Sequence, residues 1–264
     1  MTSLNARRPR FNAVHAEWTK LRTAPGTLWL LAATIVLTVA VSTAAAAATR
    51  CPAGTCFEDT TKLSLTGVVF GQAVVAILAV LGISSEYGTG MIRTTVTAMP
   101  RRCGMLAAKA AVITGPVLAA AAIAVAGCLL AGRLILPGHG FGAARDLLLA
   151  DGPVLRAAAG SVLYLALIGL LSLGIATAVR DSAVAIGLVL GLIYLFPVVA
   201  ALAANPQWHR HLEQIGPMTA GLEIQATTGL RTLPISPWAG LGVLAAWAAG
   251  ALLAGGLLLR LRDA

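Results

Sequence analysis

Charge is scarce in this chain of 264 residues. Charged residues make up 11% of it, whereas hydrophobic residues make up 58%. Soluble domains contain about 25% charged residues, so this composition indicates a membrane protein. The ten acidic residues all lie outside the long apolar stretches. Because ion-driven carriers usually keep ionisable groups near the bilayer midplane, this absence argues against a secondary transporter and against a carboxylate-based membrane protease.

Motifs for ATP hydrolysis and metal chemistry are also missing. The sequence has no Gly-x-x-x-x-Gly-Lys-[Ser/Thr] phosphate loop, only three lysines to complete one, and no His-Glu-x-x-His pattern. His209, His211 and Glu213 alternate, but two histidines and one carboxylate are weak evidence for a metal site, and we expect an interfacial turn there. We therefore expect a chain that is not an enzyme by itself and that binds no metal or cofactor.

Long apolar runs are what the sequence has in abundance. Six stretches of 19 to 23 residues carry no charge in their interior. As α-helices they would be about 28–35 Å long, which matches a hydrocarbon core of about 30 Å. In lipid such runs must be helical to satisfy their backbone polar groups, so we predict a single all-α, polytopic membrane domain. The predicted spans are Leu28–Ala48, Leu65–Ile83, Ala110–Gly132, Ala157–Val179, Ala183–Ala204 and Trp238–Leu259.

The basic residues predict the orientation of these spans. Twelve Lys and Arg residues lie in segments on one side of the predicted bundle and seven lie on the other. The richer side should face the cytoplasm, which places both termini there. Arg133 and Arg156 lie at helix ends and are also consistent with snorkelling. The net charge of +9 forms no basic patch with interleaved aromatics, so we expect no nucleic-acid partner.

Two cytoplasmic segments have patterns of their own. Apolar residues recur at helical spacing over residues 11–23, which predicts an amphipathic helix at the membrane interface, with a frayed leader as the alternative. The longest cytoplasmic loop is Ser84–Lys109, in which Gly88 and Gly90 permit a turn and Met91–Met99 can form a short helix ended by Pro100. The outer segment Asn205–Pro237 is apolar in part and contains four prolines, so it is either re-entrant or lies on the outer surface.

Few polar or aromatic side chains interrupt the spans. They are consistent with the path of an amphipathic substrate, although helix packing and interfacial anchoring are the competing interpretation. The candidate path residues are Phe70, Gln72, Tyr164, Tyr194 and Phe196. Cys51 and Cys56 lie close together in the first outer loop, where the compartment permits a disulfide.

Two segments together resemble one family. The first is His15–Thr23 before the first span, and the second is Glu86–Thr95, followed by Pro100, Arg101 and Arg102, after the second span. The chain resembles the permease subunits of type-2 ABC exporters, especially the six-helix drug and antibiotic exporters of actinobacteria. The resemblance implies a multi-pass protein of the bacterial plasma membrane, among membrane lipids, with two separate ABC ATPase subunits and a second copy or a related permease as partners.

The resemblance also implies roles for particular residues. The cytoplasmic loop after span two would hold a coupling helix that docks in a cleft of the ATPase, with the turn between spans four and five as a smaller contact. ATP and magnesium would be bound by the partner, and residues 205–237 would form short re-entrant helices. The residues that this assigns to coupling are Glu86, Tyr87, Gly88, Thr89, Gly90, Met91, Ile92, Arg93, Arg101, Arg102, Arg180 and Asp181.

The function expected from the sequence is therefore export of a hydrophobic or amphipathic substrate, such as a drug, antibiotic, lipid or peptide. The first alternative is an integral-membrane interaction or sensor protein that transports nothing. The second is a membrane enzyme that acts on lipid, for which the sequence offers no catalytic constellation.

Overall fold

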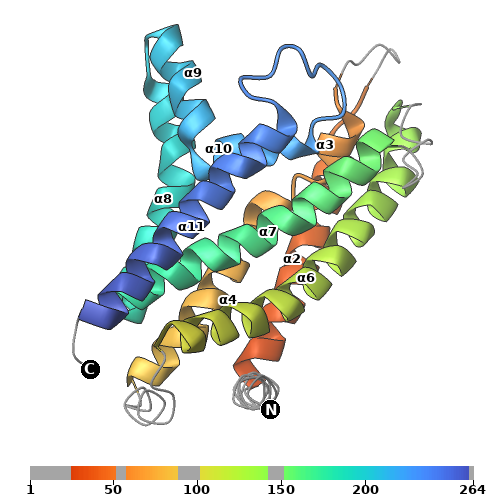
Figure 1. Cartoon of the computed structure of the whole chain (residues 1–264). Helices are drawn as coiled ribbons and strands as arrows, with labels where there is room; N and C mark the ends of the chain where they lie inside the picture. The colour runs from red at the N-terminus through yellow and green to blue at the C-terminus, as the bar shows by residue number, and fades with distance from the viewer. Residues whose placement is uncertain (1–24, 52–57, 89–101, 142–151, 262–264) are drawn as a thin grey trace, which may run out of the picture.

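The protein is a bundle of long helices, as the computed structural model shows (Figure 1). The structure describes residues 25–51, 58–88, 102–141 and 152–261, and within these ranges no strand occurs, which confirms the all-α prediction. The helices are α2 (Pro25–Ala48), α3 (Thr60–Ser64), α4 (Val68–Gly88), α6 (Arg102–Ile135), η1 (Leu136–His139), α7 (Gly152–Val179), α8 (Ser182–Leu202), α9 (Pro206–Ile215), α10 (Pro217–Leu222), η3 (Glu223–Gln225) and α11 (Pro237–Leu261).

Five described helices are long and apolar enough to cross a membrane, namely α2, α6, α7, α8 and α11. The predicted second span, 65–83, differs from the structure at its start. Asp59 caps the separate helix α3, residues 65–67 form a turn, and α4 begins only at Val68. The apolar part of α4, Val68–Ser84, is shorter than the other five. A sixth crossing therefore stays a prediction.

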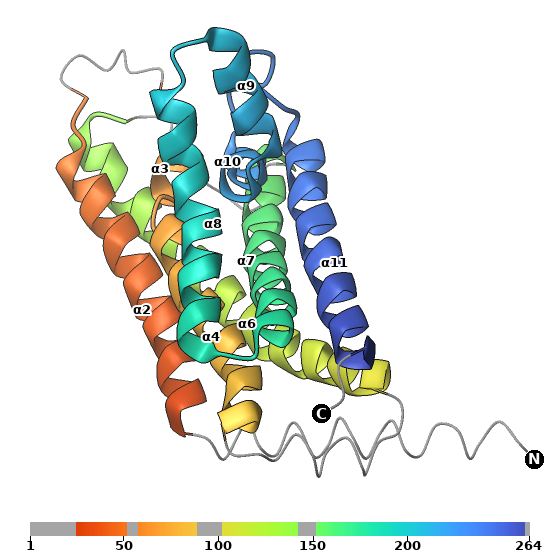
Figure 2. The same cartoon turned by 90° about the vertical axis from the view of Figure 1, so that its left-hand side faces the viewer.

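The start of α2 and the end of α11 lie at the same end of the bundle (Figure 2). This end also holds the end of α4, the start of α6 and the connection between α7 and α8. We call it the inner end, following the predicted orientation, and we call the end with α3, α9 and α10 the outer end. The predicted interfacial helix over 11–23 lies outside the described residues.

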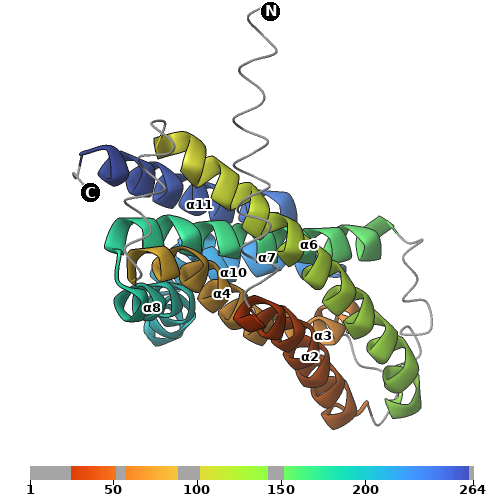
Figure 3. The same cartoon turned by 90° about the horizontal axis from the view of Figure 1, so that it is seen from below.

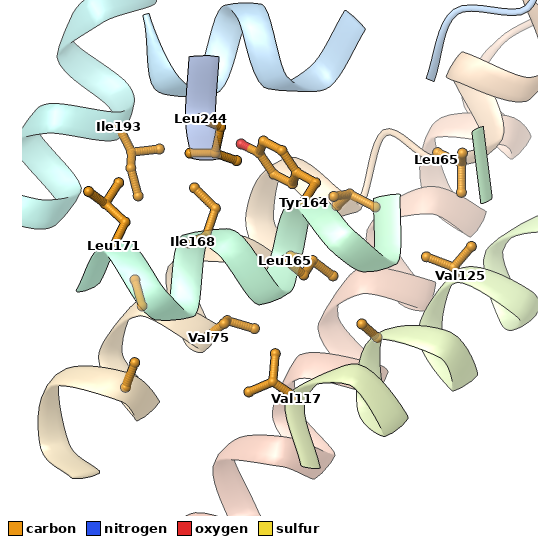
Figure 4. Packing of buried hydrophobic residues seen from close by; sticks show 14 of the residues in the cluster. Leu65, Val75, Val117, Val125, Tyr164, Leu165, Ile168, Leu171, Ile193 and Leu244 are labelled. Carbon is orange, nitrogen blue, oxygen red and sulfur yellow. The ribbon is translucent and has the colours of Figure 1, made fainter. Parts of the chain in front are cut away.

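Helix α7 lies at the centre of the bundle. It packs against α11, α4, α6 and α8, and Figure 3 shows it between α11 on one side and α4 and α8 on the other. Its side chains Leu165, Ile168 and Leu171 are completely buried and meet residues of the neighbouring helices (Figure 4). Lipid tails are as apolar as these side chains, so tight van der Waals packing holds the helices together. Gly174 allows α7 to approach the backbone of α11 at Ala251.

The close contact between α2 and α4 depends on two glycines. A Cβ added to Gly67 would clash with the carbonyl oxygen of Thr38, and one added to Gly71 would clash with the Thr38 hydroxyl. The Gly67 amide also donates a hydrogen bond to Ser42 Oγ at 2.9 Å. Gly67 and Gly71 are spaced as Gly-x-x-x-Gly, and so are Gly187 and Gly191 on α8, where neither added Cβ has a neighbour within 4 Å. Only the first pair is thus used for packing within the described part of the chain.

The outer segment after α8 forms the short helices α9 and α10, as expected for residues 205–237, whereas their re-entry into the membrane stays a prediction. α9 has no buried residue. α10 is different, because Pro217, Ala220 and Gly221 are buried and the helix packs against α8 and α11. Gly221 lies so close to the Tyr164 ring that an added Cβ would be 2.7 Å from it. α10 therefore fills the outer end of the bundle between α7, α8 and α11.

The glycine contact at α2 and α4 leads to a first prediction. Gly67→Ala should lower the free energy of unfolding by about 1–3 kcal/mol, because the new methyl group overpacks a contact with backbone that cannot move aside. The thermal unfolding midpoint of the purified chain in detergent measures this. Gly242→Ala on α11 is the matched control and should not lower the midpoint, since its methyl group enters open space. Equal midpoints for the two variants would contradict the packing argument.

Candidate functional site

The residues assigned to coupling lie at the inner end of the bundle. α4 extends to Gly88, so the backbone of Glu86 and Tyr87 is helical, and Arg102 begins α6. Residues 89–101, with Thr89, Gly90, Met91, Ile92, Arg93 and Arg101, lie outside the described residues. The short helix expected at 91–99 and its contact with an ATPase therefore stay predictions.

The second assigned contact, Arg180 and Asp181, is the turn between α7 and α8. Asp181 caps α8, and its side chain accepts a hydrogen bond from the Val184 amide at 2.8 Å. Arg180 adopts a left-handed backbone conformation with φ 66°. Both residues thus shape a tight connection between antiparallel helices. A contact between this turn and an ATPase is compatible with the exposure of Asp181 and stays a prediction.

Two of the five candidate path residues meet inside the bundle. The Tyr164 hydroxyl on α7 donates a hydrogen bond to Gln72 Oε1 on α4, and both side chains are completely buried. Gln72 Nε2 donates in turn to the thioether sulfur of Met218 on α10 at 3.2 Å. These bonds satisfy polar groups that would otherwise be costly in an apolar interior. Gln72 therefore links three helices, α4, α7 and α10, through these two hydrogen bonds.

The other three candidates have different surroundings. Tyr194 on α8 lies beside this group and donates a hydrogen bond to the Val69 carbonyl at 2.5 Å. Phe70 points out of the bundle, with half of its surface exposed. Phe196 packs edge-on against Trp247 of α11, with 6.2 Å between the ring centroids. The five residues therefore do not converge on one cavity.

The open spaces in the bundle lie elsewhere and are apolar. A cleft of 560 Å³ lies between α7, α8 and α11, where Leu171, Leu192 and Trp247 contribute to its walls. A second cleft, of 510 Å³, lies near the inner end between α6 and α11, beside Leu106 and Leu253. Neither cleft includes a charged side chain, so in a bilayer both suit hydrocarbon rather than a polar ligand.

The outer end holds a polar cluster that ties together distant parts of the chain. The Asp59 carboxylate accepts hydrogen bonds from the amides of Thr61 and Lys62 at 3.0 and 3.1 Å, which caps α3. It also accepts bonds from the Thr227 hydroxyl at 2.8 Å, the Thr228 amide at 3.0 Å and the Thr227 amide. We call this set of contacts between Asp59 and residues 227–228 the outer clamp.

Neighbouring contacts hold the same segment against α3 and α7. Lys62 Nζ lies 3.5 Å from a carboxylate oxygen of Glu223. Arg156 on α7 donates to the Ala226 carbonyl at 2.5 Å, and Gln225 donates to Ser161 Oγ at 3.1 Å. Residues 223–228 are thus held from both sides. Any movement of α10 relative to α7 must carry this segment along or break these contacts.

The outer clamp changes the acidity of its carboxyl group. Burial alone would raise the pKa of Asp59, but the hydrogen bonds from Thr227, Thr228 and Lys62 together outweigh burial and hold the pKa below its ordinary value of 3.8. Hydrogen bonds to the charged form favour ionisation. Asp59 is therefore ionised at neutral pH, and the clamp depends on its charge.

The first outer loop is held at its start. Cys51 is disulfide-bonded, whereas Cys56 lies outside the described residues, so their pairing stays a prediction. The Cys51 amide donates to the His139 carbonyl at 2.9 Å. His209 and Glu213, for which we expect an interfacial turn rather than a metal site, instead lie on the helix α9. His209 Nε2 lies 3.2 Å from Glu213, and its Nδ1 lies 2.7 Å from the Ala200 carbonyl oxygen.

Two residues of structural importance were not singled out by sequence reasoning. Asp59 has no role expected from the sequence beyond that of an acidic residue outside the bilayer, although an acid followed by Thr60 and Thr61 is a helix-start signal. Lys109 was counted as a cytoplasmic charge at the edge of a predicted span. In the structure it is buried within α6, and its Nζ donates to the Gly82 carbonyl of α4 at 3.0 Å.

These features define the class of the protein: a polytopic α-helical membrane protein with a polar clamp at its outer end. A model of the ABC-2 family transporter proteins matches residues 13–198, which is most of the chain. The chain therefore belongs to the ABC-2 family of transporter proteins, and it is a permease subunit of an ABC transporter. No curated protein matches the sequence.

The outer clamp leads to a second prediction. Asp59→Asn should lower the free energy of unfolding at pH 7 by about 1.5–3 kcal/mol, because the new amide N–H group faces backbone donors. Since the pKa of Asp59 is depressed, the native chain keeps the stabilisation above about pH 4 and loses it as the pH falls further. Thermal unfolding midpoints between pH 7 and pH 3 test both statements.

The Asn variant should lack this part of the pH dependence. Glu58→Gln is the control, because Glu58 is the exposed neighbouring carboxylate and its loss should leave the midpoint unchanged. A midpoint for Asp59→Asn that equals that of the native chain at pH 7 would show that the clamp contributes nothing.

Proposed function

We propose that this chain is the permease of an ATP-driven exporter that moves a hydrophobic or amphipathic substrate out of the cell. The observation that carries the proposal is the family match over residues 13–198, which includes the Glu86–Arg102 segment. The sequence has no phosphate loop of its own, so the driving force must come from separate ABC ATPase subunits that bind ATP and magnesium. The apolar walls of both clefts favour a hydrophobic or amphipathic substrate over an ion.

The proposed coupling contact is at the inner end, where α4 and α6 project toward the segment between them. A membrane bundle needs a rigid lever there to receive the movement of the ATPase, because packed interfaces switch between discrete arrangements. The segment Glu86–Arg102 would dock on the ATPase, and the Arg180–Asp181 turn would be the smaller contact. The outer clamp and α10 would close the exit in the conformation described.

A capture experiment tests this assignment. The tagged wild-type chain, purified from the membranes of its native cells, should retain an ABC ATPase, which mass spectrometry identifies by its phosphate loop. Deletion of residues 88–95 should abolish capture, and Glu86→Ala should weaken it several-fold, since both alter the proposed docking surface. Glu213→Ala, on the outer helix α9, is the control and should capture normally. Normal capture by the deletion variant would refute the coupling assignment, and no capture by the wild-type chain would refute the proposed function.

We also propose that two permeases pair through α8. Leu188 and Leu195 are more than half exposed on this helix, and the unused glycines Gly187 and Gly191 leave room for close approach of another helix. A second copy of the chain or a related permease would occupy this face. A substrate path between the two bundles would then run beside Phe70 and Tyr194 rather than through the buried Gln72–Tyr164 pair.

Cross-linking tests the pairing face. Leu188→Cys should give a disulfide-linked dimer on mild oxidation of membranes, because the two α8 helices would lie side by side. Leu253→Cys on α11 is the control, since this side chain is even more exposed, at 74%, but lies on another face. A dimer formed by the control and not by Leu188→Cys would overturn the assignment of α8.

A further inference from the structure

One basic residue is buried near the inner end of the bundle. Lys109 on α6 is only 3% exposed, and its Nζ donates a hydrogen bond to the Gly82 carbonyl on α4 at 3.0 Å. A buried ammonium group loses its hydration and is tolerated only when its protons meet acceptors. Ile83 on α4 and Leu106 and Ile113 on α6, which are near these residues in sequence, are also buried. The hydrogen bond to Gly82 therefore anchors the ammonium group of Lys109 between α6 and α4.

The contact joins two helices that touch little elsewhere. α4 packs mainly on α7 and α2, and α6 packs mainly on α2 and α7, whereas α4 and α6 share few contacts with each other. At Gly82 the approach is close, because an added Cβ would lie 3.0 Å from the Ile113 side chain. The Lys109–Gly82 hydrogen bond thus links α4 and α6 directly across 27 residues of sequence.

The position of this bond relates it to the proposed coupling segment. Gly82 precedes the end of α4 by six residues, and Lys109 follows the start of α6 by seven. At 1.5 Å per residue, the bond lies about 9 Å from the end of α4 and about 10.5 Å from the start of α6, the two helix ends that flank the segment. A link at this depth makes the two helix ends move as one body, whereas two unlinked ends can bend independently.

We infer that Lys109 is the positioning residue that joins α4 and α6 into a single lever for the ATPase stroke. The inference rests on the proposed function, and it names the residue that transmits force within the permease. Without the lysine, the ATPase can still dock on the segment and hydrolyse ATP. The movement of the ATPase then separates α4 from α6, and it is no longer transmitted to the outer end of the bundle.

The test uses the full chain in complex with its ATPase and needs no known substrate. Thr228→Cys is introduced as a reporter, because Thr228 is exposed beside the outer clamp and only its backbone bonds to Asp59. The rate at which a polar maleimide labels this cysteine is measured with and without ATP and vanadate, against the same chain without the reporter. ATPase capture and basal ATP hydrolysis are measured on the same samples.

The variants separate transmission from assembly. Lys109→Met keeps the length and volume of the side chain without its charge or donors, and it should reduce the ATP-dependent change in labelling at least fivefold while capture and basal hydrolysis stay within twofold of the wild type. Lys109→Arg keeps the charge and donors and should restore at least half of the change. Arg133→Met is the control, because Arg133 is an exposed basic residue at the other end of α6.

Two results would overturn the inference. The first is an unchanged ATP-dependent labelling response in Lys109→Met. The second is a parallel loss of capture, hydrolysis and labelling, which would give the lysine a merely structural role. Should Lys109→Met fail to accumulate, Lys109→Gln, which keeps a donor without a charge, is judged by the same measurements. Absence of ATPase capture by the wild-type chain would contradict the proposed function itself. This outcome is distinguishable from failure of the Lys109 inference, because that failure appears only in the comparison of the Lys109 variants with a wild-type chain that does capture the ATPase.

Discussion

The low polarity of the bilayer is the constraint on which the rest of this structure depends. Inside lipid, every backbone polar group must find its partner within a helix, and apolar side chains gain little by leaving the lipid for one another. Close packing must therefore hold the bundle together. α7 meets this need at the centre, where Gly174 lies against the backbone of α11. Gly67 and Gly71 allow a similarly close contact with Thr38 of α2.

The same constraint makes each buried polar contact specific. A side-chain hydrogen bond that has no water to compete with it selects one arrangement of the helices over the alternatives. The described residues contain such contacts at two depths: Lys109 joins α6 to α4 near the inner end, and Tyr164 joins α7 to α4 in the middle. The partly exposed outer clamp joins the start of α3 to residues 227–228 at the outer end. Together they connect the proposed site of ATPase docking to the proposed exit.

These contacts differ in how readily they can be broken. The Gln72 amide donates to a thioether, which is a weak acceptor, whereas the Asp59 carboxylate accepts several bonds from backbone and hydroxyl groups. The segment after α8 therefore makes a weak polar contact within the bundle, at Met218 of α10, and stronger polar contacts at the outer surface, at Thr227 and Thr228. The exit proposed at the outer end would then stay closed until a movement of the whole bundle breaks these contacts.

The sequence by itself determined the class of the protein, because uninterrupted apolar runs have only one stable form in lipid. Five of the six expected spans correspond to helices that meet the length of a bilayer, and Glu86–Thr95 pointed to the family that the comparison confirms. The helix ends were less accurate. α6 continues through Lys109 and Arg133 on either side of the predicted span, since a hydropathy window ends at a charge and a helix need not.

Only the tertiary structure decided which polar residues meet. Gln72 and Tyr164 are 92 residues apart in the sequence, and Asp59 and Thr227 are 168 apart. No local pattern encodes such a pairing, because it follows from the way whole helices cross and from the small residues that set their separation. For the same reason Phe70, grouped with Gln72 by sequence, faces outward, while Lys109, counted as a surface charge, lies buried against α4.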